Sequence, residues 1–297
     1  MSKVILISDL HLREDVPPCR LETQEEWYNH QYDRLSAVAD TATLHDCPIV
    51  VAGDIFHRPK VASSIVHMFI DIFRNHRVYI MAGNHDVRYA DLTDTDNGYA
   101  ILKLVFPEIN ILDNSDFIPY GSDFENNQLV GKNIVALHTL CFESEDKVPY
   151  GVKHYTTATK LLTLIDSKLI VVGDMHRPFS VQSGNKTVIN CGCMTVQRID
   201  ESKYKQGFWV YDFSTKSHEM IPYGDEMKIQ FSKNSNDVEF KEDAENRVQA
   251  LIERVKTQTD IDLDFESNLN NLLTTNEISG KVSERIKHWI EEGVTNE

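Results

Sequence analysis

The chain has 297 residues, of which 41% are apolar, and a formal net charge of −16. This size and composition suit one large globular domain with a small appendage. No apolar run approaches the roughly 20 residues of a membrane span, and the four apolar residues before Ser8 are too few for a signal peptide. Five scattered cysteines argue against a disulfide framework. We therefore expect a protein of the reducing cytoplasm that does not associate with a membrane.

Strand-like and helix-like segments alternate through the first half of the chain. In order they are a strand at 4–8, a helix at 25–45, a strand at 49–52, a helix at 61–74 and a strand at 78–82. This alternation predicts parallel strands joined by right-handed crossovers. The next elements are a short helix near 97–105, a strand ending at 138, a helix near 156–165 and a strand at 169–172.

The strand-like segments at 179–182, 187–190 and 208–213 are expected to be antiparallel and to complete a second sheet. The pattern thus predicts an α/β domain over residues 1–224. Residues 225–297 differ in composition, and two apolar stripes in them, near 242–257 and 277–291, predict a small helical appendage. Because so short a segment buries little apolar area alone, it would pack on the domain or bind a partner.

Five short polar motifs each follow one of the strand-like runs. They are Asp9-Leu10-His11, Gly53-Asp54, Gly83-Asn84-His85-Asp86, His138 and Gly173-Asp174-Met175-His176. Since parallel strands bring their carboxyl ends to one edge of a sheet, we expect the motifs to meet there rather than to be solvated loop acids and core histidines. Two metal ions sharing a bridging carboxylate could then be held by seven candidate ligands: Asp9, His11, Asp54, Asn84, His138, Asp174 and His176.

In this order the motifs resemble those of the calcineurin-like metallophosphoesterases, whose pattern is DxH, GD, GNHD, a lone histidine and GHxH. The resemblance implies a two-sheet β-sandwich flanked by helices and hydrolysis of phosphate esters by a metal-bound hydroxide. It implies that His85 protonates the leaving group, with Asp86 orienting the ring unless Asp86 only caps its loop. Asp174 replaces a family histidine, which favours Mn²⁺ or Mg²⁺ over Zn²⁺, or leaves a weak second site if Asp174 turns away.

Further details resemble the SbcD-type nucleases, the catalytic subunits of double-strand-break repair complexes. Residues 53–57 match their GD(L/I/V)FH form, in which His57 would lie near the scissile phosphate, unless it caps the next helix. Residues 189–194 stand where those chains have an NPGS turn. The resemblance implies DNA as substrate and an SbcC-like ATPase of the structural-maintenance type bound to the tail. It also implies a homodimer through helix 61–74, whose apolar surface one sheet cannot cover, unless the helix near 97–105 covers that surface within the chain.

Two other functions remain open. The negative net charge is unfavourable for binding nucleic acid and favours a small-molecule or cyclic-nucleotide phosphodiesterase or phosphatase. Against this, a positive groove could be formed by Arg13, Arg58, Lys60, Arg88 and Arg177. The third possibility is a non-catalytic scaffold with this fold, like the retromer subunit, although the complete donor set argues against it. Cys191 and Cys193 lack the further ligands of a zinc site and are expected to be small turn residues.

Overall fold

The computed structural model describes residues 2–88, 91–112, 114–118, 120 and 130–223. By its internal contacts the chain divides into two units, Met1–Ser232 and Lys233–Glu297. The helices expected in residues 225–297 lie outside the described residues and therefore stay predictions.

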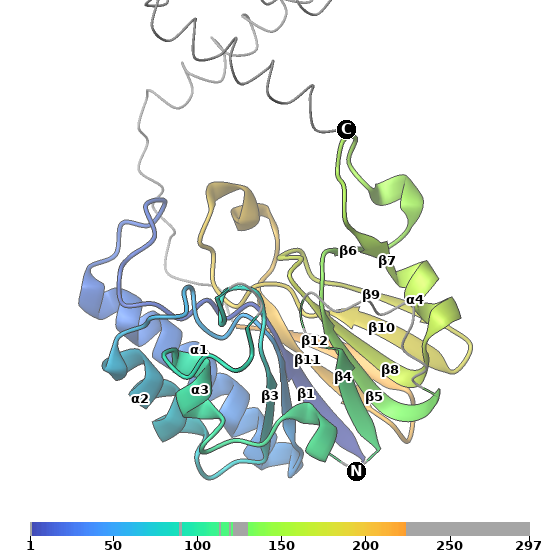
Figure 1. Cartoon of the computed structure of the whole chain (residues 1–297), viewed down its shortest axis with the longest axis horizontal. Helices are drawn as coiled ribbons and strands as arrows, with labels where there is room; N and C mark the ends of the chain where they lie inside the picture. The colour runs from blue at the N-terminus through green and yellow to red at the C-terminus, as the bar shows by residue number, and fades with distance from the viewer. Residues whose placement is uncertain (1, 89–90, 113, 119, 121–129, 224–297) are drawn as a thin grey trace, which may run out of the picture. The chain divides into compact units, whose positions relative to one another are not determined.

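The first sheet has five strands in the order β12-β11-β1-β2-β3 (Figure 1). Its parallel part consists of β1 (Lys3–Ile7), β2 (Ile49–Ala52) and β3 (Val78–Met81). The crossovers are α1 (Gln24–His45) and α2 (Ser63–Phe73). The side chain of Thr23 caps α1 and Glu26 completes the capping box, so the helix begins where the sequence predicts. The predicted alternation of strands and helices is confirmed.

The prediction that residues 208–213 belong to the second sheet is wrong. This segment forms β11 (Gly207–Asp212), which pairs antiparallel with β1 in the first sheet, and β12 (Ser217–Pro222) then pairs with β11. An apolar strand pattern reports burial but does not specify the partner strand. Strand β1 pairs with β2 along one edge, and β11 pairs with its other edge.

The second sheet also has five strands, in the order β4-β5-β8-β10-β9. The parallel strands are β4 (Ser115–Ile118), β5 (Val130–His138), β8 (Asp166–Gly173) and β10 (Lys186–Asn190). As predicted, β9 (Phe179–Ser183) runs antiparallel to β10. The smaller elements are α3 (Gly98–Leu102), α4 (Ala158–Leu164), β6 (Cys141–Phe142), β7 (Thr156–Thr157) and the 3₁₀ turns η1 (Ile109–Ile111), η2 (Glu145–Lys147) and η3 (Ile199–Lys203).

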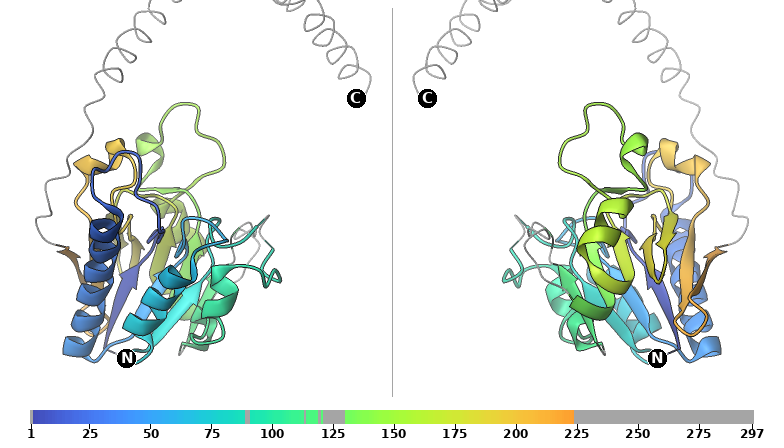
Figure 2. Two further views of the ribbon diagram at one scale, coloured as in Figure 1. Left: turned by 90° about the vertical axis from the view of Figure 1, so that its left-hand side faces the viewer. Right: turned by 90° about the vertical axis from the view of Figure 1, so that its right-hand side faces the viewer.

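Alternate side chains of β1 face different layers. Val4 and Leu6 pack against the second sheet, whereas Ile5 and Ile7 pack on the opposite side with residues of α1 and α2. On the far face of the second sheet, Leu161 of α4 is buried. Helices α1, α2 and α3 therefore cover one outer face and α4 covers the other (Figure 2). This is the expected two-sheet sandwich flanked by helices. Among the described helices, none has the length and hydropathy of a membrane span.

Helix α2 is covered within the chain. Ile65, Phe69 and Phe73 are fully buried, and the rings of Phe69 and Phe106 meet edge to face with centroids 5.5 Å apart. Ile70 and Ile72 are partly buried against the same core, so α2 leaves little of the extra apolar surface from which the homodimer was expected. Exposed apolar side chains lie further along the chain, at Ile101, Leu104, Val105 and Ile111.

Candidate metal centre

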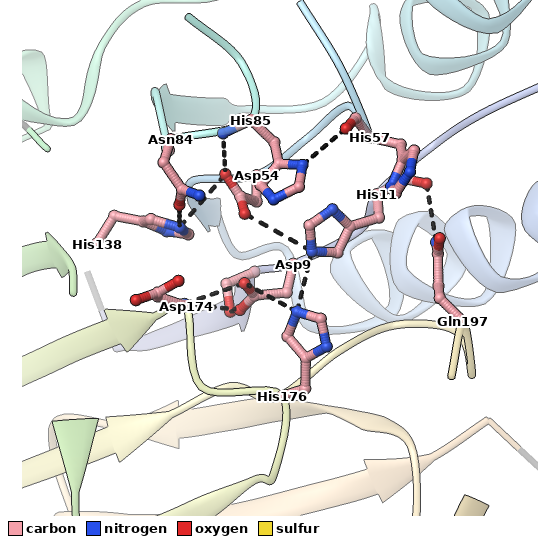
Figure 3. Close-up of polar contacts among 12 residues, drawn as sticks. Asp9, His11, Asp54, His57, Asn84, His85, His138, Asp174, His176 and Gln197 are labelled. Carbon is pink, nitrogen blue, oxygen red and sulfur yellow. Dashed lines mark hydrogen bonds and ion pairs between the residues drawn. The ribbon is translucent and has the colours of Figure 1, made fainter. Parts of the chain in front are cut away.

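The ends of β1, β2, β3, β5 and β8 carry the polar motifs to one place (Figure 3). A first group of donors surrounds His11. Its Nε2 atom lies 3.0 Å from Nε2 of His176 and 3.6 Å from Oδ2 of Asp54. The Nε2 atom of His176 is also 3.9 Å from Oδ1 of Asp9. The structure therefore brings four of the seven candidate ligands together here.

A second group of donors surrounds His138. Its Nε2 atom lies 3.0 Å from Oδ1 of Asn84 and 3.3 Å from Oδ1 of Asp54. Asp54 thus directs one carboxylate oxygen toward each group. This is the position that a carboxylate bridging two cations would take.

The arrangement of these atoms fits divalent cations. Two ligands bound to one ion at about 2.1 Å and at right angles would lie about 3 Å apart, which is the spacing between His11 and His176. The ring Nδ1–H of His138 donates to the carbonyl of Ala52 at 2.9 Å, so loss of the Nε2 proton would leave the Nε2 lone pair available to a cation. Imidazole, carboxylate and amide oxygen together suit Mn²⁺, Mg²⁺ or Zn²⁺.

The buried acids make the site strongly negative. Burial raises the pKa of Asp9 to about 6. Burial alone would lower the pKa of His138, yet the carboxylates of Asp54, Asp9 and Asp174 together outweigh burial and raise that pKa to about 10. A charge balance that favours a cationic histidine would also favour a metal cation at the same place.

The backbone of the site is held in an uncommon conformation. The left-handed region is occupied by Asp9 (φ 51°), His11 (φ 45°), Asp54 (φ 51°) and Asp174 (φ 89°). Such residues cost about 1–3 kcal/mol each and cluster at functional sites. Gly53 has φ +89°, and a Cβ there would collide with the ring of His138, so glycine is needed before Asp54.

Asp174 is anchored through its backbone. Its N–H donates to both carboxylate oxygens of Asp9, at 3.0 and 3.2 Å. Burial raises the pKa of its carboxyl group, and His138 is the charged neighbour that acts on it most strongly. Its predicted role as a ligand therefore stays a prediction, but Asp174 lies at the expected edge of the site.

The expectation that Asp86 orients the His85 ring is wrong. His85 donates its Nδ1–H to the backbone carbonyl of His57 at 2.7 Å. The buried Asp86 carboxylate instead accepts the backbone N–H groups of Ile55 (3.2 Å), Phe56 (2.8 Å) and Gly83 (2.9 Å). Asp86 thus ties the loop after β2 to the loop after β3, as a loop-capping residue does.

His57 lies beside the candidate acid rather than capping a helix. Its ring centroid is 5.6 Å from that of His85 and 5.8 Å from that of His11. Arg13 contacts its Nε2 atom at 3.1 Å. Burial and then the Arg13 charge lower the pKa of His57 to about 4, so this ring is neutral at physiological pH.

The cations considered for a positive groove are paired with acids. Arg13 forms an ion pair with Asp15, and Arg58 with Glu14 and Asp15. Further pairs are Lys60 with Asp96 at 2.7 Å and Arg177 with Glu143 at 3.3 Å. These four side chains therefore add little net positive charge around the site.

Sequence reasoning missed two residues that hold His176. Glu201, in η3, accepts the His176 Nδ1–H at 2.6 Å. The amide of Asn190 donates to the carbonyls of Met175 (2.6 Å) and Arg177 (2.8 Å) and fixes the loop on either side. No motif marks Glu201, because the contact joins residues 25 positions apart that only the folded chain brings together.

The turn after β10 contains Cys191 and Cys193 as buried free thiols. Burial raises the pKa of both thiols, so neither is a ready thiolate. Donor atoms of Cys193, His176 and Glu201 do lie within 4.8 Å of one another. Both cysteines lie in the turn, as predicted. The sequence did not predict that Cys193 lies close to His176.

Comparison with known proteins matches residues 2–189, more than half of the chain, to the family described as calcineurin-like phosphoesterase. Among curated proteins, none matches. A solved archaeal phosphodiesterase is similar at 13% sequence identity and a TM-score of 0.39, over 74% of this chain and 99% of its own. A predicted phosphoesterase from Streptococcus pneumoniae TIGR4 is similar at 13% sequence identity and a TM-score of 0.36. The match covers 78% of this chain and 95% of that protein. Vacuolar protein sorting 29 from Cryptosporidium parvum is similar at 16% sequence identity and a TM-score of 0.35. The match covers 74% of this chain and 95% of that protein.

Proposed function

The chain belongs to the family of calcineurin-like phosphoesterases, and from this premise we propose that it is a two-metal DNA nuclease subunit of the SbcD type. The observation that carries the two-metal part is the position of Asp54, with one oxygen 3.6 Å from His11 Nε2 and the other 3.3 Å from His138 Nε2. Bound divalent ions would orient the phosphate and neutralise its developing charge. Mn²⁺ is the ion we expect to support activity best.

The residues of the chain supply the proton transfer. His85 is fixed by the bond of its Nδ1 atom to the carbonyl of His57, which leaves its Nε2 atom available to a substrate. A histidine in that position can donate a proton to the leaving oxygen as the ester bond breaks. The neutral His57 ring contacts Arg13 at 3.1 Å, and both side chains could bind the phosphate of the substrate.

Support for DNA as the substrate comes from sequence features. His57 belongs to the GD(L/I/V)FH form of SbcD-type nucleases, in which this histidine lies near the scissile phosphate, and here it lies next to His85, the candidate acid. An SbcC-like ATPase, bound through residues 225–297, would supply the positive charge that this chain lacks.

We also retain the homodimer as a proposal, now through the exposed side chains near Leu104. Light scattering that shows only a 34.1 kDa species at micromolar concentration would remove it.

A small-molecule or cyclic-nucleotide phosphodiesterase is the second candidate. The ion pairs that neutralise Arg13, Arg58, Lys60 and Arg177 favour it, because a small diester needs no extended positive surface. Full-length protein should be assayed with Mn²⁺ on linear duplex DNA, bis-p-nitrophenyl phosphate and cyclic nucleotides. Cleavage of DNA, stimulated by the ATPase and ATP, supports the nuclease. Turnover of small diesters alone supports the second candidate, and no turnover with any divalent ion supports a scaffold.

A further inference from the structure

The carboxylate of Glu201 is fixed on both of its oxygens. Glu201 lies in η3, and the residue is 2% exposed. Its Oε2 atom accepts two backbone N–H groups, from Gln197 at 2.8 Å and from Arg198 at 3.0 Å. The Oε1 atom accepts the ring Nδ1–H of His176 at 2.6 Å. The Oε1 atom thus faces the His176 ring, and the carboxylate cannot rotate away without breaking these three hydrogen bonds.

The rest of His176 is held independently of Glu201. Its backbone carbonyl accepts the N–H of Cys193 at 3.1 Å, and Asn190 binds the carbonyls of the residues on either side. The backbone position of His176 is therefore set by the loop. What Glu201 adds is the choice of which ring nitrogen carries the proton.

We propose that Glu201 is a positioning residue that keeps the proton of His176 on Nδ1, so that Nε2 presents its lone pair to a divalent cation. This Nε2 atom is the one that lies 3.0 Å from His11 and 3.9 Å from Asp9. A carboxylate that accepts the second ring N–H of a metal-binding histidine commonly strengthens metal affinity. The inference rests on the proposed metal-dependent function and names a residue that the site's own motifs do not include.

The substitution Glu201→Gln separates this role from a merely structural one. The two backbone N–H groups require an oxygen at the position of Oε2, so the amide NH₂ must face Nδ1 of His176. The ring would then accept at Nδ1 and carry its proton on Nε2, where it blocks the cation. The size of the side chain and the bonds to Gln197 and Arg198 are retained.

The test has two readouts besides activity. The first is the tautomer of His176, measured by ¹⁵N NMR of histidine-labelled, metal-free full-length protein at a pH where this ring is neutral. The signal is assigned with His176→Gln. The second is Mn²⁺ affinity and stoichiometry by calorimetry. We expect an Nδ1–H tautomer in the wild type, an Nε2–H tautomer in Glu201→Gln, and Mn²⁺ affinity about 10–100-fold weaker in the variant. Glu108→Gln, at a carboxylate that accepts from the hydroxyl of Tyr99, serves as the matched control.

Each other outcome decides against the inference. A wild-type ring protonated on Nε2 would overturn it without any variant having to fold. Wild-type affinity in Glu201→Gln would do the same. Loss of one bound ion in both Glu201→Gln and Cys193→Ser, with the tautomer unchanged, would point instead to a metal held by His176, Cys193 and Glu201. Wild-type protein that binds no divalent ion would overturn the proposed function itself, a result seen before any variant is compared.

Discussion

The ring of His85 is oriented by the backbone carbonyl of His57, 2.7 Å from its Nδ1 atom, and not by a carboxylate. A carbonyl cannot be removed by side-chain substitution, so this orientation depends on the path of the loop after β2. That loop is in turn held by the buried carboxylate of Asp86, which binds the N–H groups of Ile55 and Phe56. The two neighbours His85 and Asp86 therefore have separable roles, one in chemistry and one in loop structure.

Replacement of the candidate acid should affect turnover and leave metal binding intact. In His85→Ala we expect hydrolysis of a model diester to fall about 10²–10⁴-fold, the usual cost of losing a general acid or base. Mn²⁺ stoichiometry should remain that of the wild type, since the backbone N–H of residue 85, which donates to Asp54, is retained. His67→Ala, on the exposed face of α2, is the control. Near-normal turnover in His85→Ala would remove this residue from the mechanism.

Replacement of Asp86 should affect stability first. In Asp86→Asn the amide can no longer accept all three backbone N–H groups, and its own NH₂ is placed against donors. We expect a loss of about 1–3 kcal/mol in the free energy of unfolding, measured by urea denaturation. Asp71→Asn, at an exposed position of α2, should stay within about 0.5 kcal/mol of the wild type. A fully stable Asp86→Asn protein that has lost activity would return Asp86 to the catalytic group.

The pH dependence of stability should reveal the negative charge of the metal-free site. The pKa values of Asp9 and Asp86 are raised by burial to about 6 and about 7, so deprotonating either carboxyl costs stability as the pH rises from about 4 through those values. The pKa of His138 is raised to about 10, so its contribution is complete below about 6.5 and is lost as the pH rises toward 10. Each of these three shifts lowers the stability of the metal-free protein as the pH rises. The lowered pKa values of His30 and His57, about 3 and about 4, act in the opposite direction, but only up to about pH 6.5.

The corresponding measurement is thermal unfolding in a chelator at about pH 7 and about pH 9, because in this range the histidines with lowered pKa values no longer change stability while His138 still does. We expect a lower Tm at the higher pH, by at least the 2–4 °C that about 1 kcal/mol gives for a domain of this size. Saturating Mn²⁺ should remove most of the difference, because a bound cation stabilises the ionised acids. An equal Tm at both pH values in chelator would contradict the assigned charge balance.

The sequence predicted the strand ends well because a buried parallel strand and the polar residue after it form one local pattern. Asp9, Asp54 and His138 lie where that pattern places them. Long-range pairing is not encoded locally, which is why β11 was assigned to the wrong sheet. Contacts that use main-chain atoms or distant acids, such as His57 with His85 and Glu201 with His176, depend on the finished fold.

Asp174 can be tested by restoring the histidine that the family pattern has at this position. Asp174→His adds a nitrogen donor and removes a negative charge, so the metal preference should move from Mn²⁺ toward Zn²⁺. The backbone bonds to Asp9 use the N–H of residue 174 and are independent of its side chain. Activity and affinity curves for both ions decide the outcome. Asp174→Asn, which removes only the charge, is the matched variant, and curves identical to wild type in both proteins would mean that Asp174 is not a ligand.

The tail can be tested by truncation after Gly224. Residues 225–297 lie outside the described residues, whereas every candidate ligand lies in the described part of the catalytic unit, so model-diester hydrolysis should be largely retained. If the apolar stripe that includes Trp289 docks on an SbcC-like ATPase, truncation should abolish co-purification with that ATPase and ATP-stimulated DNA cleavage. Trp289→Ala in the full chain is the milder variant and should weaken the association without changing diester hydrolysis. A truncated protein that still binds the ATPase would refute the docking role. One that unfolds would show instead that the tail packs on the catalytic unit.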